Sequence, residues 1–478
     1  MKRTGMKRRT FLRQAGAAAA LGCVAPRSFG QDGGQNGAQA IQATLAIESN
    51  PLYPFPADFL GLSYESAQLA NPAFFAAENS GLVGLVRELA PNGVLRIGGN
   101  TSEFTQFTTN EAVGASAIDA AGPDSSKHVD SDTPVTPKAL SNLRAFLDAT
   151  NWRCIYGLNG ARGTAENAAE EASYVDKILG PRLIAFQIGN EVDAWRTRYR
   201  PATWSYPDYW QQWVQFHKAI VAKAPHAKFA GPDIASRVAY VTGFAEDAKM
   251  SAPDVVMLTS HYYGMGPAGA PGMTIDRLLT PDPKLEGYLK TTMEAAHASG
   301  LPYRMSEGNT CWNGGQEGVS DTLASALWAP DMMLTFATVG CAGVNFHGGG
   351  EGYYTPIAGT IAKGFERRPE YFGMKLMKPL LGATLVRSTL TCDNKTGDDE
   401  RISAYAARNA GHTLLMAINK TAQPAEIKTP LRGARQAWVL SGPAIDAKQG
   451  VTLSEQKPNA LRGGTLHVPA YTAILIED

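Results

Sequence analysis

Short apolar runs alternate with longer amphipathic stretches through most of this 478-residue chain. A short apolar run bounded by turn residues favours a strand, and a 3.6-residue period favours a helix. This alternation predicts a parallel α/β architecture, and eight strands predict a (β/α)8 TIM barrel. The expected strands cover residues 59–64, 94–97, 154–158, 183–188, 228–231, 255–260, 303–306 and 344–346, and the expected helices 82–89, 165–179, 209–223, 285–298, 322–339 and 371–381.

From about residue 382 the pattern changes to strand-like runs separated by turn residues, with no helical period. Such a pattern predicts an all-β sandwich over residues 382–478. Residues 41–47 also alternate like a strand, so we expect the segment 31–57 to be a leader plus a strand that joins this sandwich. The barrel then spans 58–381, with the polar stretch 119–137 as a rim loop. The expected C-terminal strands are 384–390, 401–406, 412–419, 425–429, 436–440 and 466–477.

Glutamates stand at the ends of two expected barrel strands that face each other, namely Glu191 after the fourth strand and Glu307 at the seventh. A carboxylate at the end of a buried strand is costly unless it is paired, hydrogen-bonded or functional. At the C-terminal mouth of a barrel, such side chains point into the usual site of chemistry. Two carboxylates about 5 Å apart suit retaining glycoside hydrolysis. The alternative is that Asn190 and Glu191 only close a strand.

Three further polar residues stand within or beside the expected strands. Arg96 lies inside an apolar run and needs a partner, for which an ion pair is the structural explanation. His261 and Tyr263 have the spacing that places both side chains on one face of an extended segment. His261 is either part of a pocket wall or a core histidine with satisfied hydrogen bonds.

Seven stretches, listed at the end of this paragraph by residue number, follow one another in the order found in glycoside hydrolase family 79. The chain therefore resembles this family, the β-glucuronidases and heparanases of clan A. The resemblance implies Glu191 as acid/base and Glu307 as nucleophile, with Arg96 and Tyr263 steadying the nucleophile. It also implies the barrel with a β-sandwich and a requirement for neither metal nor cofactor. The matching segments are residues 61–66, 95–100, 188–191, 260–263, 307, 318–322 and 343–349.

The resemblance also suggests how a glucuronic acid ring would be held. Asn190 would grip the 2-hydroxyl, and Glu65 and Asn100 the 3- and 4-hydroxyls, although Glu65 also fits an ion pair at a strand end. Two glycine-rich loops are candidates for the uronate carboxylate because their backbone N–H groups can face an anion. The family uses a Tyr hydroxyl in the first loop, where this chain has Trp312. The candidate donors are Trp312, Gly314 and either Tyr353 or Tyr354.

The formal net charge is zero, but residues 1–30 hold seven basic residues and no acidic one. The rest of the chain therefore carries 37 basic and 44 acidic residues, which argues against a nucleic-acid surface. Residues 7–13 form a twin-arginine pattern before a short apolar run, so we expect 1–30 to be an export signal and the protein to be periplasmic or secreted. A lipoprotein box at 20–23 is the less favoured alternative.

The sequence therefore predicts an exported retaining exo-β-glucuronidase acting on a glucuronide or a glucuronic-acid-containing oligosaccharide, with no nucleic-acid partner and no membrane span. Other clan A activities remain open, namely a β-xylosidase, an arabinofuranosidase or an endo-acting heparanase-like enzyme. A non-catalytic carbohydrate-binding protein is the third class. Cys154, Cys311, Cys341 and Cys392 show no metal-ligand spacing and read as thiols, with a Cys311–Cys341 bridge left open.

Overall fold

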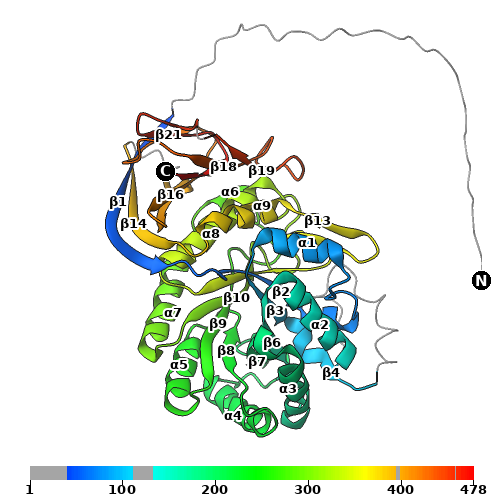
Figure 1. The fold of residues 1–478 in the computed structure, drawn as a ribbon. Helices are drawn as coiled ribbons and strands as arrows, with labels where there is room; N and C mark the ends of the chain where they lie inside the picture. The colour runs from blue at the N-terminus through cyan, green and yellow to red at the C-terminus, as the bar shows by residue number, and fades with distance from the viewer. Residues whose placement is uncertain (1–39, 111–132, 394–398, 458) are drawn as a thin grey trace, which may run out of the picture. The chain divides into compact units, whose positions relative to one another are not determined.

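The computed structural model describes residues 40–110, 133–393, 399–457 and 459–478. Eight parallel strands close into a barrel in the order β10-β11-β2-β3-β6-β7-β8-β9, which confirms the predicted TIM barrel (Figure 1). The barrel strands are β2 (Leu60–Glu65), β3 (Val94–Gly98), β6 (Arg153–Leu158), β7 (Leu183–Ile188), β8 (Phe229–Ile234), β9 (Val255–Tyr263), β10 (Tyr303–Asn309) and β11 (Gly343–Gly348).

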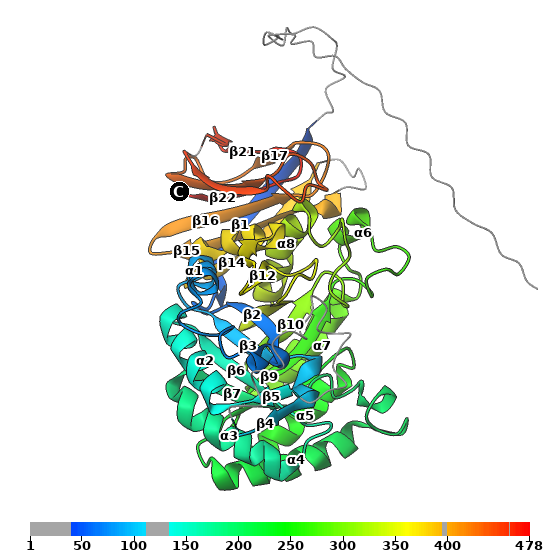
Figure 2. The same cartoon turned by 90° about the vertical axis from the view of Figure 1, so that its right-hand side faces the viewer.

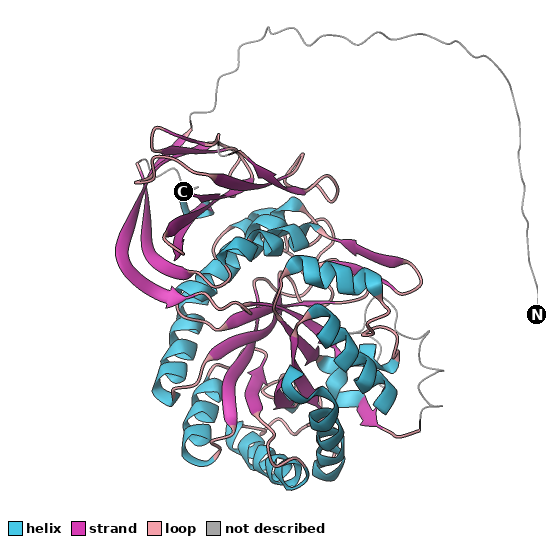
Figure 3. Ribbon diagram, viewed as in Figure 1, coloured by secondary structure: helices cyan, strands magenta, loops and turns pink. Residues whose placement is uncertain are grey.

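Helices surround the barrel on its outside (Figure 3). They cover the strands because each presents an apolar stripe inward, as the buried leucines and alanines of these helices show. The helices are α1 (Ser80–Leu89), α2 (Pro137–Thr150), α3 (Ala165–Leu179), α4 (Tyr206–Lys223), α5 (Ala239–Ser251), α7 (Leu285–Ser299), α8 (Leu323–Thr338) and α9 (Pro369–Leu376), with the short α6 (Ile275–Leu279) in the segment after β9.

The sequence predicts a rim loop over residues 119–137. Residues 119–132 lie outside the described residues, and for residues 133–137 the prediction is wrong. Thr133–Val135 forms strand β5, which pairs with β4 (Thr105–Phe107). Pro137 is the first residue of α2, a helix that the sequence pattern did not suggest. The Thr136 side chain accepts a hydrogen bond from the Ala139 N–H, so a Thr-Pro capping signal was present within the polar stretch.

The second region is one ten-stranded sheet in the order β19-β18-β22-β16-β15-β14-β1-β17-β21-β20 (Figure 2). Strand β1 pairs with β14 and β17, so a segment from before the barrel completes a sheet from after it. The strands are β1 (Ile41–Pro54), β14 (Thr384–Cys392), β15 (Ile402–Asn409), β16 (His412–Asn419), β17 (Ala425–Lys428), β18 (Gln436–Ser441), β19 (Thr452–Gln456), β20 (Leu461–Arg462), β21 (Thr465–Val468) and β22 (Thr472–Glu477).

This sheet curls over a core of its own, because alternate residues of its strands point inward. Ile41, Ala43 and Leu45 of β1 are buried there together with Ile427 and Leu466. The expected single strand 466–477 is wrong, since β21 and β22 are separate strands joined by a turn in which Tyr471 has a φ of +48°. Strands β19 and β20 were not anticipated.

Helix α8 connects the two regions. It is apolar on nearly all sides and packs on α9 as well as on β1, β14 and β16 of the sheet. At this junction Asp331 accepts hydrogen bonds from Ser403 and Tyr405 and pairs with Lys420 at 2.5 Å. A helix without a polar face is stable only when covered on several sides, as here.

Two further findings bear on the sequence predictions. Within the described part of the chain, Cys154, Cys311 and Cys341 are buried and form no disulfide, so no Cys311–Cys341 bridge exists, and Cys392 is half-buried. Among the same residues, no helix has the length and apolar character needed to cross a bilayer.

The remaining strands, β12 (Ile357–Thr360) and β13 (Gly364–Arg367), form a hairpin after the last barrel strand.

Candidate active site

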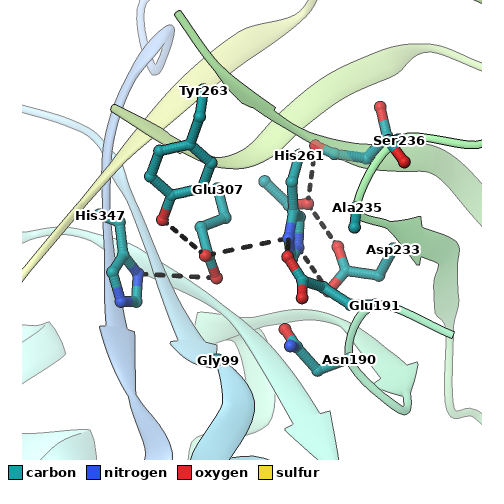
Figure 4. A network of polar contacts seen from close by, with 12 residues as sticks. Gly99, Asn190, Glu191, Asp233, Ala235, Ser236, His261, Tyr263, Glu307 and His347 are labelled. Atoms are coloured by element: carbon teal, nitrogen blue, oxygen red, sulfur yellow. Dashed lines mark hydrogen bonds and ion pairs between the residues drawn. The ribbon is translucent and has the colours of Figure 1, made fainter. Parts of the chain in front are cut away.

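The two predicted carboxylates lie together at the C-terminal mouth of the barrel (Figure 4). Glu191 follows β7, the fourth barrel strand, and Glu307 belongs to β10, the seventh. Carboxylate oxygens of Glu191 and Glu307 and a ring nitrogen of His261 all lie within 4.8 Å of one another. This separation matches the spacing of about 5–5.5 Å in retaining glycosidases and not the wider spacing of about 6.5–9.5 Å in inverting ones.

A sharp turn after β7 brings Glu191 into this position. Glu191 has a φ of +48° and Gly189 a φ of +88°, in the left-handed region. A Cβ at Gly189 would lie 2.4 Å from the Trp195 ring, so only glycine fits here. The Gly-Asn-Glu sequence therefore encodes the turn as well as the carboxylate.

Glu307 is held as an anion by two hydrogen-bond donors and a neighbouring imidazole. The Arg96 guanidinium donates to one carboxylate oxygen at 2.7 Å, the Tyr263 hydroxyl donates to the other at 2.8 Å, and His347 Nδ1 lies 3.6 Å away. Burial by itself would raise the pKa of Glu307, but the charges of His347, His261 and Arg96 and the Tyr263 hydrogen bond lower it well below its usual range. The carboxylate is therefore ionised, as a nucleophile requires.

Arg96 is fully buried on β3 and contacts side chains from four other strands. It pairs with Asp233 on β8 at 2.5 Å and donates to the Asn190 side-chain oxygen at 2.7 Å. It also donates to Gln187 and Ser63. Because these four acceptors and Glu307 come from β2, β7 with the turn after it, β8 and β10, the guanidinium sets the positions of residues from four strands.

His261 lies between the carboxylates of Glu191 and Glu307 on one side and the carboxylate of Asp233 on the other. Its Nδ1 is 3.2 Å from Glu191 and 3.9 Å from Glu307, and its Nε2 is 3.1 Å from Asp233. Burial lowers the pKa of His261, but the charges of Glu307 and Asp233 outweigh burial and raise it well above 6.5. The shift therefore favours the cationic form of a ring that lies between carboxylates on both sides, not a core histidine of neutral surroundings.

A buried glutamate behind the turn fixes the backbone next to Glu191. The Asn190 N–H and the Ala161 N–H each donate to Glu103 at 2.6 Å. Burial raises the pKa of Glu103 to about 7, despite these backbone hydrogen bonds, which lower it. The contact ties the loop after β6 to the loop after β7.

The space beside these residues is a cavity of about 850 Å³. Glu65, Asn100 and His347 line one part of it, and the Glu65 carboxylate accepts from the Thr101 N–H and hydroxyl at 2.8 and 2.6 Å. Gly99 has a φ of +72°, and a Cβ there would lie 2.4 Å from the Glu65 carboxyl carbon. Glu65 is thus a held carboxylate facing the cavity, and its nearest cation is His347 at 3.5 Å.

The residues expected at a uronate carboxylate divide between two cavities. Trp312 and Tyr354 line the catalytic cavity. Tyr353 and Gly314 line a neighbouring cavity instead, and the Tyr353 hydroxyl donates to Glu317. The Gly314 carbonyl accepts from the Tyr354 N–H. Of the two tyrosines, Tyr354 therefore lines the catalytic cavity and Tyr353 does not. Gly314 lines the neighbouring cavity.

Sequence reasoning missed Asp233, His347 and Glu103. A signal existed for Asp233, because it is an acidic residue within the otherwise apolar strand β8, where a carboxylate must have a partner. His347 belongs to a segment that carried the family resemblance, but its role beside Glu307 appears only in the fold. Glu103 lies in a short 3-10 helix with no pattern that marks it.

Glu191, His261 and Glu307 are also close enough to hold a metal ion. A histidine ligand must be deprotonated, whereas the raised pKa of His261 favours its cationic form.

No family model matches the chain. A β-glucuronidase of Aspergillus niger is 23% identical over 363 residues, which cover 70% of this chain and 65% of that protein. A β-glucuronidase of Neurospora crassa is 26% identical over 315 residues, or 58% of this chain and 54% of that protein. The matched region thus spans less than two thirds of the length of either relative. The two matches confirm the resemblance to β-glucuronidases.

Solved structures share the fold. A 4-O-α-L-rhamnosyl-β-D-glucuronidase of Fusarium oxysporum has a TM-score of 0.68 at 18% identity, covering 91% of this chain and all of that one. A family 51 arabinofuranosidase of Xanthomonas axonopodis has a TM-score of 0.64 at 14% identity, covering 92% of this chain and 99% of that one. Both support a glycosidase-type barrel with an all-β region.

Replacing Arg96 by methionine tests its role in holding the site together. Arg96→Met leaves Asp233 and Glu307 buried without the guanidinium, so we expect the free energy of unfolding to fall by about 3–5 kcal/mol. Urea unfolding at pH 7 measures this loss. The matched control is Arg153→Met, because Arg153 is half exposed and pairs with Asp58 at the surface, where about 1 kcal/mol or less is expected.

The pH dependence of this loss has a defined sign. Asp233 and Glu307 have lowered pKa values in the folded state, although burial opposes the shift. Their stabilisation is therefore present above the unfolded pKa of about 4 and is lost as the pH falls through the folded values. The difference between wild type and Arg96→Met should shrink in acid; a difference that is constant from pH 7 to pH 3, or absent, would contradict the role assigned to Arg96.

Proposed function

We propose that this protein is a retaining exo-β-glucuronidase in which Glu191 is the acid/base and Glu307 the nucleophile. The observation that carries the proposal is the approach of these two carboxylates to within 4.8 Å, on the fourth and seventh strands of the barrel. The activity of the two curated relatives supports the choice of substrate.

The reaction follows from the contacts around each carboxylate. Glu191 protonates the glycosidic oxygen while the Glu307 carboxylate attacks the anomeric carbon and forms a glycosyl-enzyme ester. Glu191 then removes a proton from a water molecule, whose oxygen attacks the same carbon and releases Glu307. Arg96 and Tyr263 keep Glu307 ionised and oriented before attack, and His261 donates toward Glu191 when that residue is anionic.

Asn190 is oriented for the sugar 2-hydroxyl by its own hydrogen bond. Its side-chain oxygen accepts from Arg96, so its amide nitrogen is the end that remains to donate. A donor to the 2-hydroxyl strengthens its bond as the transition state forms. Glu65 and Asn100 line the catalytic cavity and supply acceptors and donors for the other ring hydroxyls.

The uronate carboxylate is assigned to the side of the cavity formed by Tyr354, Trp312 and Asn313. A Tyr hydroxyl, an indole N–H and an Asn amide are all neutral donors, which suit a carboxylate held without a full countercharge.

The second candidate function is that of an arabinofuranosidase or a β-xylosidase. Trp312, which stands where family 79 has a Tyr, and the fold likeness to arabinofuranosidases favour it.

A panel of nitrophenyl glycosides separates these candidates. We expect turnover of the β-glucuronide and none of the β-xyloside or the α-arabinofuranoside, because only the glucuronide has a carboxylate for Tyr354 and Trp312. Turnover of a pentoside without the glucuronide would contradict the substrate assignment. Digestion of heparan sulfate into oligosaccharides would show endo action instead of exo action.

The nucleophile is tested by trapping. Incubation with 2-fluoro-glucuronyl fluoride should leave an ester on Glu307, which peptide mass spectrometry locates. Glu191→Gln should lower kcat by about 10²–10⁴-fold, as expected for loss of general acid–base catalysis. Recovery of the ester on another residue would overturn the assignment. Equal background rates for Glu307→Gln and wild type would show a non-catalytic carbohydrate-binding protein.

We also propose that the protein is exported by the twin-arginine route. The support is the Arg8-Arg9 pair before the apolar run in residues 1–30, which lie outside the described residues. Replacing both arginines by lysine should keep the unprocessed protein in the cytoplasm of a host that carries this pathway. The measurement is the amount and size of the protein in periplasmic and cytoplasmic fractions, with Lys2→Arg and Arg3→Lys together as control. Equal periplasmic amounts for the double lysine variant and wild type would contradict the proposal.

A further inference from the structure

The Asn309 side chain is a buried link between β10 and the loop after β11. Asn309 is the last residue of β10, two residues after the proposed nucleophile, and is fully buried. Its amide nitrogen donates to the carbonyl oxygens of His347 and Tyr354, at 3.0 and 3.1 Å, and to the Glu370 carboxyl at 3.0 Å. Its side-chain oxygen accepts from the Thr310 N–H at 2.6 Å. The proposed reaction gives this amide no task.

These contacts leave one orientation for the amide. The Thr310 N–H needs an acceptor, so the Asn309 oxygen faces it and the NH2 group faces the other three oxygens. The NH2 group has two N–H bonds for three acceptors, so one N–H is shared between two of them. Because these residues are buried, removing the amide takes a hydrogen bond from oxygens that water does not reach, and such a loss is costly.

Glu370 ties the same amide to helix α9. It lies in the first turn of α9 and is fully buried. Burial raises the pKa of Glu370 well above 4.5, although the Asn309 hydrogen bond lowers it, and the shift favours the neutral carboxyl. A neutral carboxyl still accepts from the amide and avoids the cost of a buried charge. Asn309 is therefore joined to the helix that follows the loop as well as to the loop itself.

Both backbone polar groups of Tyr354 are bonded to the segment that follows the nucleophile. The Tyr354 carbonyl accepts from Asn309, and the Tyr354 N–H donates to the Gly314 carbonyl at 3.3 Å. Tyr354 is 7% exposed, and the centre of its ring lies 5.8 Å from that of His347 and 6.3 Å from that of Tyr263. These bonds and ring contacts together fix the place of Tyr354 at the catalytic cavity.

His347 depends on the Asn309 amide less than Tyr354 does. His347 belongs to β11, where it pairs with Ser63 in the ladder with β2, and its Nδ1 lies 3.1 Å from the Ser63 hydroxyl. Tyr354 lies in the loop between β11 and β12. Loss of the amide therefore leaves His347 held by the barrel sheet but removes the hydrogen bond that holds the Tyr354 carbonyl.

A glucuronyl ring requires a fixed distance between the nucleophile and the donors to its carboxylate. The anomeric carbon and the carbon that bears the carboxylate are both bonded to the ring oxygen, so the two groups cannot move apart. Supporting residues must therefore hold the donors to within about 0.5 Å of the productive geometry. Asn309 joins the strand of Glu307 to the loop of Tyr354 and so sets this distance.

We propose that Asn309 is a positioning residue for recognition of the uronate carboxylate and that it acts through Tyr354. This proposal rests on the proposed glucuronidase function, which assigns the carboxylate to the side of Tyr354. Of the described residues, those that line the catalytic cavity include Tyr354 and not Asn309. Removal of the amide therefore changes the affinity for a carboxylate only through the residue that the amide holds.

The test measures how strongly the protein prefers a carboxylate. Two iminosugars of the gluco configuration serve as probes, identical except that carbon 6 is a carboxylate in one and a hydroxymethyl group in the other. Titration calorimetry gives the Kd of each, and wild type should bind the carboxylate probe more tightly. Asn309→Ala should lower this preference about tenfold and change the Kd of the hydroxymethyl probe less than about threefold, as expected for a hydrogen bond to a charged group.

A double variant decides whether Asn309 acts through Tyr354. Tyr354→Phe removes the hydroxyl and should itself lower the preference. Adding Asn309→Ala to Tyr354→Phe should lower the preference little further, because effects of residues that act as a unit are not additive.

Asn419→Ala is the matched control. Asn419 is fully buried in the all-β region, and its amide nitrogen also donates to three oxygens, the carbonyls of Gln423, Val468 and Pro469. This variant should lose stability, as Asn309→Ala does, and keep the wild-type preference for the carboxylate probe.

Three results would overturn the proposal: an Asn309→Ala variant with the wild-type preference, an equal weakening of both probes, or losses that add in the double variant. Asn309→Ser also removes the amide and gives the same comparison if Asn309→Ala does not fold. A wild type without preference for the carboxylate would instead overturn the proposed glucuronidase function, and the role of Asn309 with it.

Discussion

The Arg96 guanidinium is the contact around which the barrel mouth is arranged. It bonds side chains from β2, β7, β8 and β10 while lying fully buried on β3. A buried guanidinium is tolerated only when acceptors surround it, and acceptors at these positions become fixed in turn. Its planar, forked shape meets several acceptors at once, which a lysine ammonium does not reproduce. The orientation of Asn190 follows from this group, and together with His347 and His261 it keeps Glu307 ionised.

Charge is distributed so that the two glutamates face different surroundings. Glu307 is buried among Arg96, His261 and His347, whereas the Glu191 side chain is 26% exposed and its nearest cation is His261. The buried Asp233 holds the other ring nitrogen of His261. Such separation of environments is how paired carboxylates take the different roles of nucleophile and acid/base.

The all-β region also contributes to the neighbourhood of the site. It is joined to the barrel through α8 and the Asp331–Lys420 pair, and it supplies Lys448 beside Glu317 and Tyr353. Because loops at the barrel mouth carry specificity on a common scaffold, a second region that supports one of those loops can influence which sugars fit. The chain order supports this arrangement, since β1 precedes the barrel yet pairs with β14 after it.

The barrel, the all-β region and the two glutamates could be predicted from the amino-acid sequence. The bounds of α3 and β7 match the prediction residue for residue, because helix and strand periods are local properties of the chain. Helix α2 was missed because its Thr-Pro start lies within a polar stretch. The folded arrangement was needed to show that Tyr354, and not Tyr353, lines the catalytic cavity. It was also needed to show that Asp233, His347 and Glu103 support the site. These contacts join residues far apart in sequence, such as Arg96 and Glu307 at a separation of 211, and depend on strand register and loop packing that no local pattern encodes.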